Sequence, residues 1–190
     1  MRRLLACLAL LVVAGGALAA PRSFTLGHHG TLTLSMPEDW TADVRGSTSP
    51  EAFAILLSPK GGPRFEILLD IPFPPKASAK PPDAAAMRKE VAAAAQQAAL
   101  QSVEHSLPLK ELTGPAVSGF YFRATDRAPA PGEYKFMAQG MARSGTLVLA
   151  FTILTNDGQD EVAEAALEML RSAVHQPQGA AAAAPTEPRP

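Results

Sequence analysis

Short runs in which apolar and polar residues alternate dominate the first part of the chain. A period of two is typical of β-strands with one face toward a core. The alternating runs are residues 23–27, 31–36, 41–45, 51–58 and 64–71. His28, His29 and Gly30 separate the first two runs, and the Pro- and Gly-containing stretch 59–63 separates the last two. Both separations predict hairpin turns between antiparallel strands.

The pattern changes at Pro72, where five prolines fall within residues 72–82 and predict a surface connection. Asp83 is a good N-cap residue, and the alanine-rich stretch after it predicts a helix over residues 83–106. The stretch is rich in alanine and its apolar face is thin, so the helix has to lie close to a sheet. That face comprises Met87, Val91, Ala94, Ala98 and Val103.

Four further strands are predicted after this helix, over residues 107–114, 116–126, 132–143 and 145–155. Glycine-containing turns separate the last three, which indicates an antiparallel meander. The final strand is apolar at both odd and even positions. We therefore expect it in the centre of a sheet that is covered on both faces.

A second helix is predicted over residues 156–175, with acids near its start and Arg171 and His175 near its end, as the helix dipole favours. His105 takes the same place at the end of the first helix. The apolar stripe of the second helix comprises Val162, Ala166, Met169, Leu170 and Ala173. The whole pattern predicts an α+β fold: a mostly antiparallel twisted sheet of six to eight strands with at least two packed helices.

The first 19 residues have the three parts of a secretory signal peptide. Arg2 and Arg3 precede an apolar run too short to span a bilayer as a stable helix, and residues 17–19 form a cleavage site of small residues. We expect cleavage after Ala19, localisation in the periplasm or outside the cell, and no membrane insertion of the mature chain. A lipoprotein signal ending at Cys7 is disfavoured because too little apolar sequence precedes the cysteine.

Composition sets further limits. Cleavage leaves 15 basic and 18 acidic residues, a net charge of −3, with no clustered basic footprint for nucleic acid. It also removes the one cysteine, so no disulfide or thiolate site is expected. Residues 176–190 are rich in alanine and proline without apolar periodicity, which predicts a disordered tail. A single domain over residues 20–175 remains.

The order of these elements, together with GTLTLSMPEDW at residues 30–40, resembles the PsbP/Mog-like superfamily of α/β sandwiches. The shared features are an apolar strand that ends at Pro37 with Trp40 just beyond it, two strands before a long helix, a later meander and a closing helix. The resemblance spans about residues 23–175. It implies a binding or accessory protein, since the group includes the extrinsic PsbP proteins of photosystem II and Ran-binding Mog proteins. It transfers no catalytic residue, and neither oxygen evolution nor Ran binding, because no functional surface matches residue by residue.

The sequence carries no motif for catalysis. Ser118 and Ser144 lack the frame of a nucleophile elbow, and the chain has no zinc-protease motif and no phosphate-binding glycine loop. No catalytic residue and no cofactor is therefore predicted. His28 and His29 are the obvious metal candidates, but adjacent strand residues point to opposite faces and no acid lies nearby to complete a site. Solvated turn histidines are the favoured interpretation, and no metal site is predicted.

The stretch GFYFRATD, residues 119–126, contains the candidate partner surface. Tyr121 and Arg123 share one face of the predicted strand, and Phe120 and Phe122 share the opposite face. If this strand pairs with the next, Lys135 and Gln139 are expected beside them on a partly open, mixed face that a protein partner can contact. The alternative is an ordinary solvated sheet face with cross-strand pairs.

These observations predict an exported, non-enzymatic binding or accessory protein that presents a sheet face or a loop to a protein partner. One alternative is a small-molecule carrier with a pocket between sheet and helices, under the alanine-rich helix. A hydrolase with a site assembled from dispersed residues is the other. The sequence identifies neither the partner nor the oligomeric state.

Overall fold

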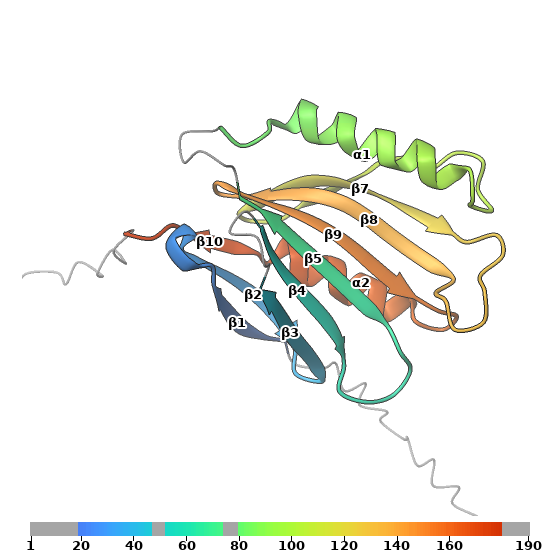
Figure 1. Ribbon diagram of the computed structural model, residues 1–190, viewed down its shortest axis with the longest axis horizontal. Coiled ribbons are helices and arrows are strands. Elements are labelled where there is room, and N and C mark those ends of the chain that lie inside the picture. The colour runs from blue at the N-terminus through green and yellow to red at the C-terminus, as the bar shows by residue number, and fades with distance from the viewer. Residues whose placement is uncertain (1–18, 47–51, 74–79, 180–190) are drawn as a thin grey trace, which may run out of the picture.

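A computed structural model describes residues 19–46, 52–73 and 80–179. A seven-stranded antiparallel sheet forms its centre, with α1 on one face and α2, together with a three-stranded sheet, on the other (Figure 1). We call these two sides of the large sheet the α1 face and the α2 face. The α+β class and the two packed helices confirm the prediction from the residue pattern. Within the described residues the strands form two antiparallel sheets, whereas the pattern predicted one.

The strands of the large sheet follow the order β3-β4-β5-β9-β8-β7-β6. Their bounds are β3 (Trp40–Gly46), β4 (Ala52–Pro59), β5 (Glu66–Pro72), β9 (Leu147–Thr155), β8 (Phe136–Ser144), β7 (Val117–Thr125) and β6 (Lys110–Thr113). The small sheet has the order β1-β2-β10. It contains β1 (Ala19–Thr25), β2 (Thr31–Pro37) and β10 (Val174–Gln176), and the 3-10 turn η1 (Gly27–His29) joins the first two. The helices are α1 (Ala84–Ala99) and α2 (Asp160–Arg171).

The central place of β9 confirms the prediction from its apolar pattern, because β5 lies on one side of it and β8 on the other. The first two predicted strands, by contrast, are not part of the large sheet. They form the small sheet with β10, a strand that the sequence pattern did not predict.

Both predicted helices are shorter than the pattern indicated. Asp83 caps α1 as expected, since its Oδ1 accepts a hydrogen bond from the Ala86 amide at 2.8 Å. The helix nevertheless ends at Ala99 instead of residue 106, because the next residues pair with the end of β7: the Val103 amide donates to the Thr125 carbonyl at 2.8 Å. Val103 therefore lies outside the helix and is 54% exposed, and His105 does not close α1.

Helix α2 ends at Arg171 instead of continuing to residue 175. The Ser172 hydroxyl donates to the Met169 carbonyl and accepts from the Ser35 amide of β2, which turns the chain toward the small sheet. The following residues form β10, in which His175 pairs with Leu32. The predicted position of His175 at a helix end is therefore wrong.

The main core lies between the α2 face, α2 and the small sheet. Trp40 is 3% exposed there and packs on Phe65 with a ring separation of 4.9 Å. A smaller core lies between α1 and the α1 face of β7, where Val91 and Ala95 meet Phe122. Two packed layers thus bury both faces of β7.

The predicted signal peptide and tail lie mostly outside the described residues and stay predictions. Ala19, the last residue of the predicted signal peptide, is the first residue of β1. Gln176, the first residue of the predicted tail, is the last residue of β10. No helix in the described ranges is long and apolar enough to cross a membrane.

Candidate functional site

The four residues of the predicted partner surface do not share one face. Tyr121 is 5% exposed and belongs to the main core on the α2 face. Gln139 pairs with Phe122 and with Thr152, so it points to the α1 face. The prediction of a shared face is wrong, because β7 and β8 align Tyr121 with Gly140, and a pattern within one strand does not set the register between two.

The two basic residues of the predicted partner surface, Arg123 and Lys135, form ion pairs with acidic residues in or near α2. Arg123 forms an ion pair with Glu164 of α2, and the Lys135 ammonium lies 2.8 Å from an Asp157 carboxylate oxygen. The sequence pattern placed Lys135 within this strand, but β8 begins one residue later, at Phe136. These residues link the sheet to the start of α2, and partner binding by them stays a prediction.

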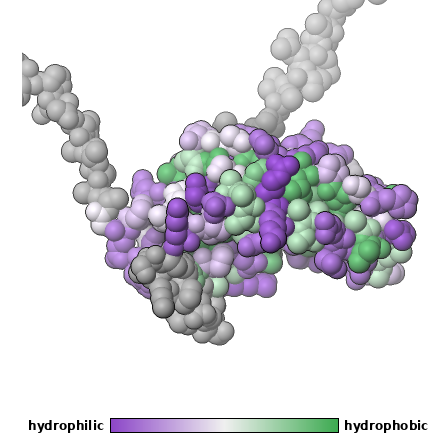
Figure 2. All heavy atoms as spheres, turned by 90° about the horizontal axis from the view of Figure 1, so that it is seen from above, coloured by the Kyte–Doolittle hydropathy of each residue, from purple (hydrophilic) through white to green (hydrophobic). Residues whose placement is uncertain are grey.

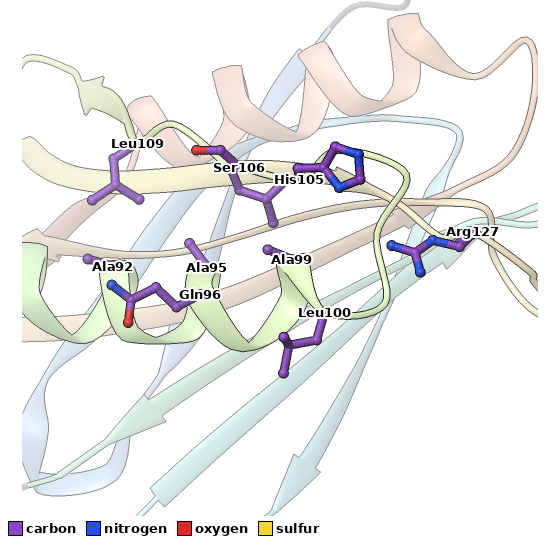
Figure 3. A pocket seen from close by; sticks show the side chains of 10 residues that line it. Ala92, Ala95, Gln96, Ala99, Leu100, His105, Ser106, Leu109 and Arg127 are labelled. Carbon is purple, nitrogen blue, oxygen red and sulfur yellow. The ribbon is translucent and has the colours of Figure 1, made fainter.

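A cavity of about 590 Å³ lies between α1 and the segment 100–109, which leads from α1 to β6 (Figure 3). We call it the α1 groove. Its volume falls within the range of small-molecule sites. Its apolar lining comprises Ala92, Ala95, Ala99, Leu100, Leu107 and Leu109, and its polar lining comprises Gln96, His105, Ser106 and Arg127. The sequence suggested a pocket under the alanine-rich helix, and the groove lies along one flank of that helix.

The alanines of α1 explain why the space exists. Ala92, Ala95 and Ala99 recur every three or four residues and point from the helix toward the facing segment (Figure 3). A side chain that ends at Cβ lets the helix lie close to the sheet but fills little of the flank. Viewed from the α1 side, the surface shows hydrophobic patches between hydrophilic side chains (Figure 2). Leu100 adds to this apolar character, since it is 71% exposed.

Hydrogen bonds to the end of β7 hold the outer wall of the groove in place. The Glu104 carboxylate accepts from the Thr125 amide at 3.0 Å and from its hydroxyl at 2.7 Å. The Arg127 amide donates to the Gln101 carbonyl at 3.1 Å. Partial burial opposes ionisation of Glu104, but the hydrogen bonds from Thr125 outweigh it and hold the pKa of this carboxyl below its usual value. These hydrogen bonds tie the segment 100–109 to the end of β7.

Arg127 places a positive charge at one end of the groove. Its side chain reaches toward the space between Leu100 and His105 (Figure 3). The guanidinium donates to the Ser102 carbonyl at 2.7 Å and forms no ion pair with another described residue. Donors that remain on a guanidinium suit a carboxylate or another anionic group.

Two smaller cavities contain other predicted residues. Gln139 lines a cavity of about 270 Å³ beside Asp70 and Glu90 on the α1 face. Arg123 lines one of about 200 Å³ beside Glu104. Neither cavity brings the predicted partner residues together.

No protein-family model matches the chain, and no curated protein sequence matches it. Among solved structures it is similar to the cyanobacterial PsbP of Synechocystis, with 8% identity, a TM-score of 0.47 and coverage of 89% of this chain and 99% of that one. It is also similar to a protein from Bacteroides thetaiotaomicron, with 15% identity and a TM-score of 0.47 over 78% of this chain. The chain spans 46% of that second protein. A PsbP protein, from the superfamily that the sequence resembles, is among these similar structures.

His28 and His29, interpreted from the sequence as solvated turn residues, lie near a third histidine, His175. His175 Nε2 lies 2.8 Å from the His29 carbonyl oxygen, and the His29 ring stacks on Phe73 at 3.7 Å. Burial, followed by the nearby His28 and His175, lowers the pKa of His29. Within the described residues, no group of three histidine, cysteine or acidic side chains is arranged to hold a metal ion. Sequence reasoning missed this cluster because it assigned His175 to a helix.

Proposed function

We propose that the chain is an exported, non-enzymatic binding protein and that the α1 groove takes a small, mainly apolar ligand with an anionic group. The observation that carries this proposal is the α1 groove itself, which combines alanine and leucine side chains with polar groups and has a guanidinium at one end. The signal-like N-terminus supports export.

The lining favours an apolar body for the ligand. Six of its ten residues are alanine or leucine, so a hydrocarbon chain or ring in the groove removes apolar surface from water on both sides. The wall that Glu104 anchors is already in position, which limits the ordering cost of binding.

The polar residues favour an anionic head group. Arg127 carries a permanent positive charge, while Gln96, His105 and Ser106 provide further hydrogen-bonding groups around the space. A simple ligand of this kind is a medium-chain carboxylate.

Isothermal titration calorimetry with dodecanoate tests the proposal. Ala99→Phe fills the groove and is expected to weaken binding about ten-fold or more, a loss of roughly 1.4 kcal/mol. Ala93→Phe is the matched control, because Ala93 is exposed on the same helix and does not line the groove, so it should leave affinity unchanged. Arg127→Gln should weaken dodecanoate binding but leave binding of the neutral dodecyl maltoside unaltered.

The proposal fails if dodecanoate does not bind, or if the two alanine variants lose affinity equally. Native mass spectrometry of the protein purified from the periplasm adds an independent readout, since a carrier often retains its ligand. A retained mass that Ala99→Phe removes and Ala93→Phe keeps would identify the groove as its site.

A further inference from the structure

The strands at the edges of the two sheets differ in how readily another strand can pair with them. Proteins commonly protect edge strands by shortness or by proline. Strands β6 and β10 have only four and three residues, and β1 contains Pro21, which has no N–H to donate. Strand β3 has seven residues and no proline, and in the described part of the chain it pairs with β4 alone (Figure 1).

The outer part of β3 exposes one apolar and two charged side chains. Val44 is 46% exposed and pairs with Ile55 of the main core, so it lies on the α2 face at the border of that core. Asp43 and Arg45 point to the opposite face, where Arg45 Nε lies 3.4 Å from Asp43 Oδ2. The Asp43 side chain is 69% exposed and the Arg45 side chain 62%. Their mutual attraction adds little to stability at such exposure.

The order of these three residues is self-complementary. Two antiparallel copies of β3 centred on Val44 place each Val44 opposite the other, and each Asp43 opposite an Arg45. Ala42 then lies opposite Gly46, so no bulky pair is forced. Registers centred on Asp43 or on Arg45 instead bring like charges together, which disfavours them.

We propose that two copies of the chain associate through β3 in this two-fold antiparallel register, which joins their seven-stranded sheets into one. The contact is isologous, as in most soluble homodimers. It uses the edge of the sheet opposite β6, whereas the α1 groove lies beside β7, so ligand binding and self-association use different surfaces.

A cysteine at the two-fold axis tests the register directly. In a full-length Cys7→Ser background, Val44→Cys places two thiols opposite each other and should give a disulfide-linked dimer under mild oxidation. Ala42→Cys is the matched control. In this register residue 42 lies opposite Gly46 of the second copy, so the two introduced thiols are too far apart to form a disulfide. Absence of the Val44→Cys dimer, or equal cross-linking of both variants, overturns the proposal.

Charge exchange tests the same register without a covalent bond. Sedimentation velocity over a concentration series should show a reversible dimer for the unmodified protein. Asp43→Arg and Arg45→Asp should each raise the dissociation constant about ten-fold, and the double variant should restore it, because the exchange preserves both cross-strand pairs. Glu111→Arg makes the same change of charge on β6 and should have no effect. A monomer at all concentrations, or a double variant as weak as the single ones, contradicts the proposal.

Discussion

His29 shows how one side chain can make stability depend on pH. Its pKa in the folded chain is lowered because burial, His28 and His175 disfavour the charged ring. The unfolded chain therefore binds a proton at a higher pH than the folded chain does. The contribution of the neutral His29 ring to the free energy of unfolding is therefore fully present above the ordinary histidine pKa of about 6.5. It declines as the pH falls below that value.

Replacement of His29 by phenylalanine should flatten that decline. Phenylalanine keeps the stacking on Phe73 but cannot take up a proton. Urea unfolding at pH 7.5 and at pH 5.5 should show that His29→Phe loses less stability on acidification than the unmodified protein. We expect a difference of about a few tenths of a kcal/mol, since the ring is partly exposed. His105→Phe serves as the control, and an unchanged pH dependence in His29→Phe would contradict the assignment.

At the same scale, some residues could be predicted from the sequence and others could not. Asp83 was identified as a helix cap because capping depends on the residue and its next few neighbours. The environments of Tyr121 and Gln139 depend on the register between β7 and β8 and on α2 covering one face. No local pattern contains that information.

At the scale of elements, the segment 100–109 matters because Glu104 ties it to β7. Glu104→Ala removes two hydrogen bonds to Thr125 and should lower the free energy of unfolding by about 1 kcal/mol at pH 7. Because the pKa of Glu104 is lowered in the folded chain, this contribution is present above the ordinary carboxyl pKa and disappears as the pH falls through the folded value. Urea unfolding at stepwise lower pH measures it.

The same variant should also weaken dodecanoate binding, since the wall of the α1 groove loses an anchor. Glu90→Ala is the matched control, because Glu90 is exposed on α1 and does not line that groove. A Glu104→Ala protein with unchanged stability at pH 7 would show that the anchor contributes nothing.

The ends of the helices mark the limit of prediction at this scale. The existence of α1 and α2 followed from composition and periodicity, but their last turns did not form. Both helices end where a distant partner takes the backbone hydrogen bonds: Thr125 binds the segment after α1, and β2 pairs with β10 after α2. Tertiary pairing overrides local propensity at such positions.

For the whole molecule, the fold class was predictable because alternation and periodicity record which faces are buried. The α+β architecture and the central β9 are confirmed. The division into two sheets was not predictable, and neither were the exact position and lining of the α1 groove, because they depend on how distant elements pack. The alanine-rich composition of α1 gave the one local sign of the groove, and it indicates close packing equally well.

Export remains a prediction for the whole molecule, and the structure sharpens its test. Cleavage after Ala19 would remove one residue of β1 and leave Ala20 to Thr25 paired with β2, so the mature chain keeps this edge of the small sheet. Expression of the full chain in a bacterium should therefore yield a stable periplasmic protein that begins at Ala20, as intact-mass analysis would show. Ala17→Gln combined with Ala19→Gln should block processing and retain the precursor, because the cleavage site requires small residues. A full-length chain in the cytoplasmic fraction of the unmodified protein would rule export out.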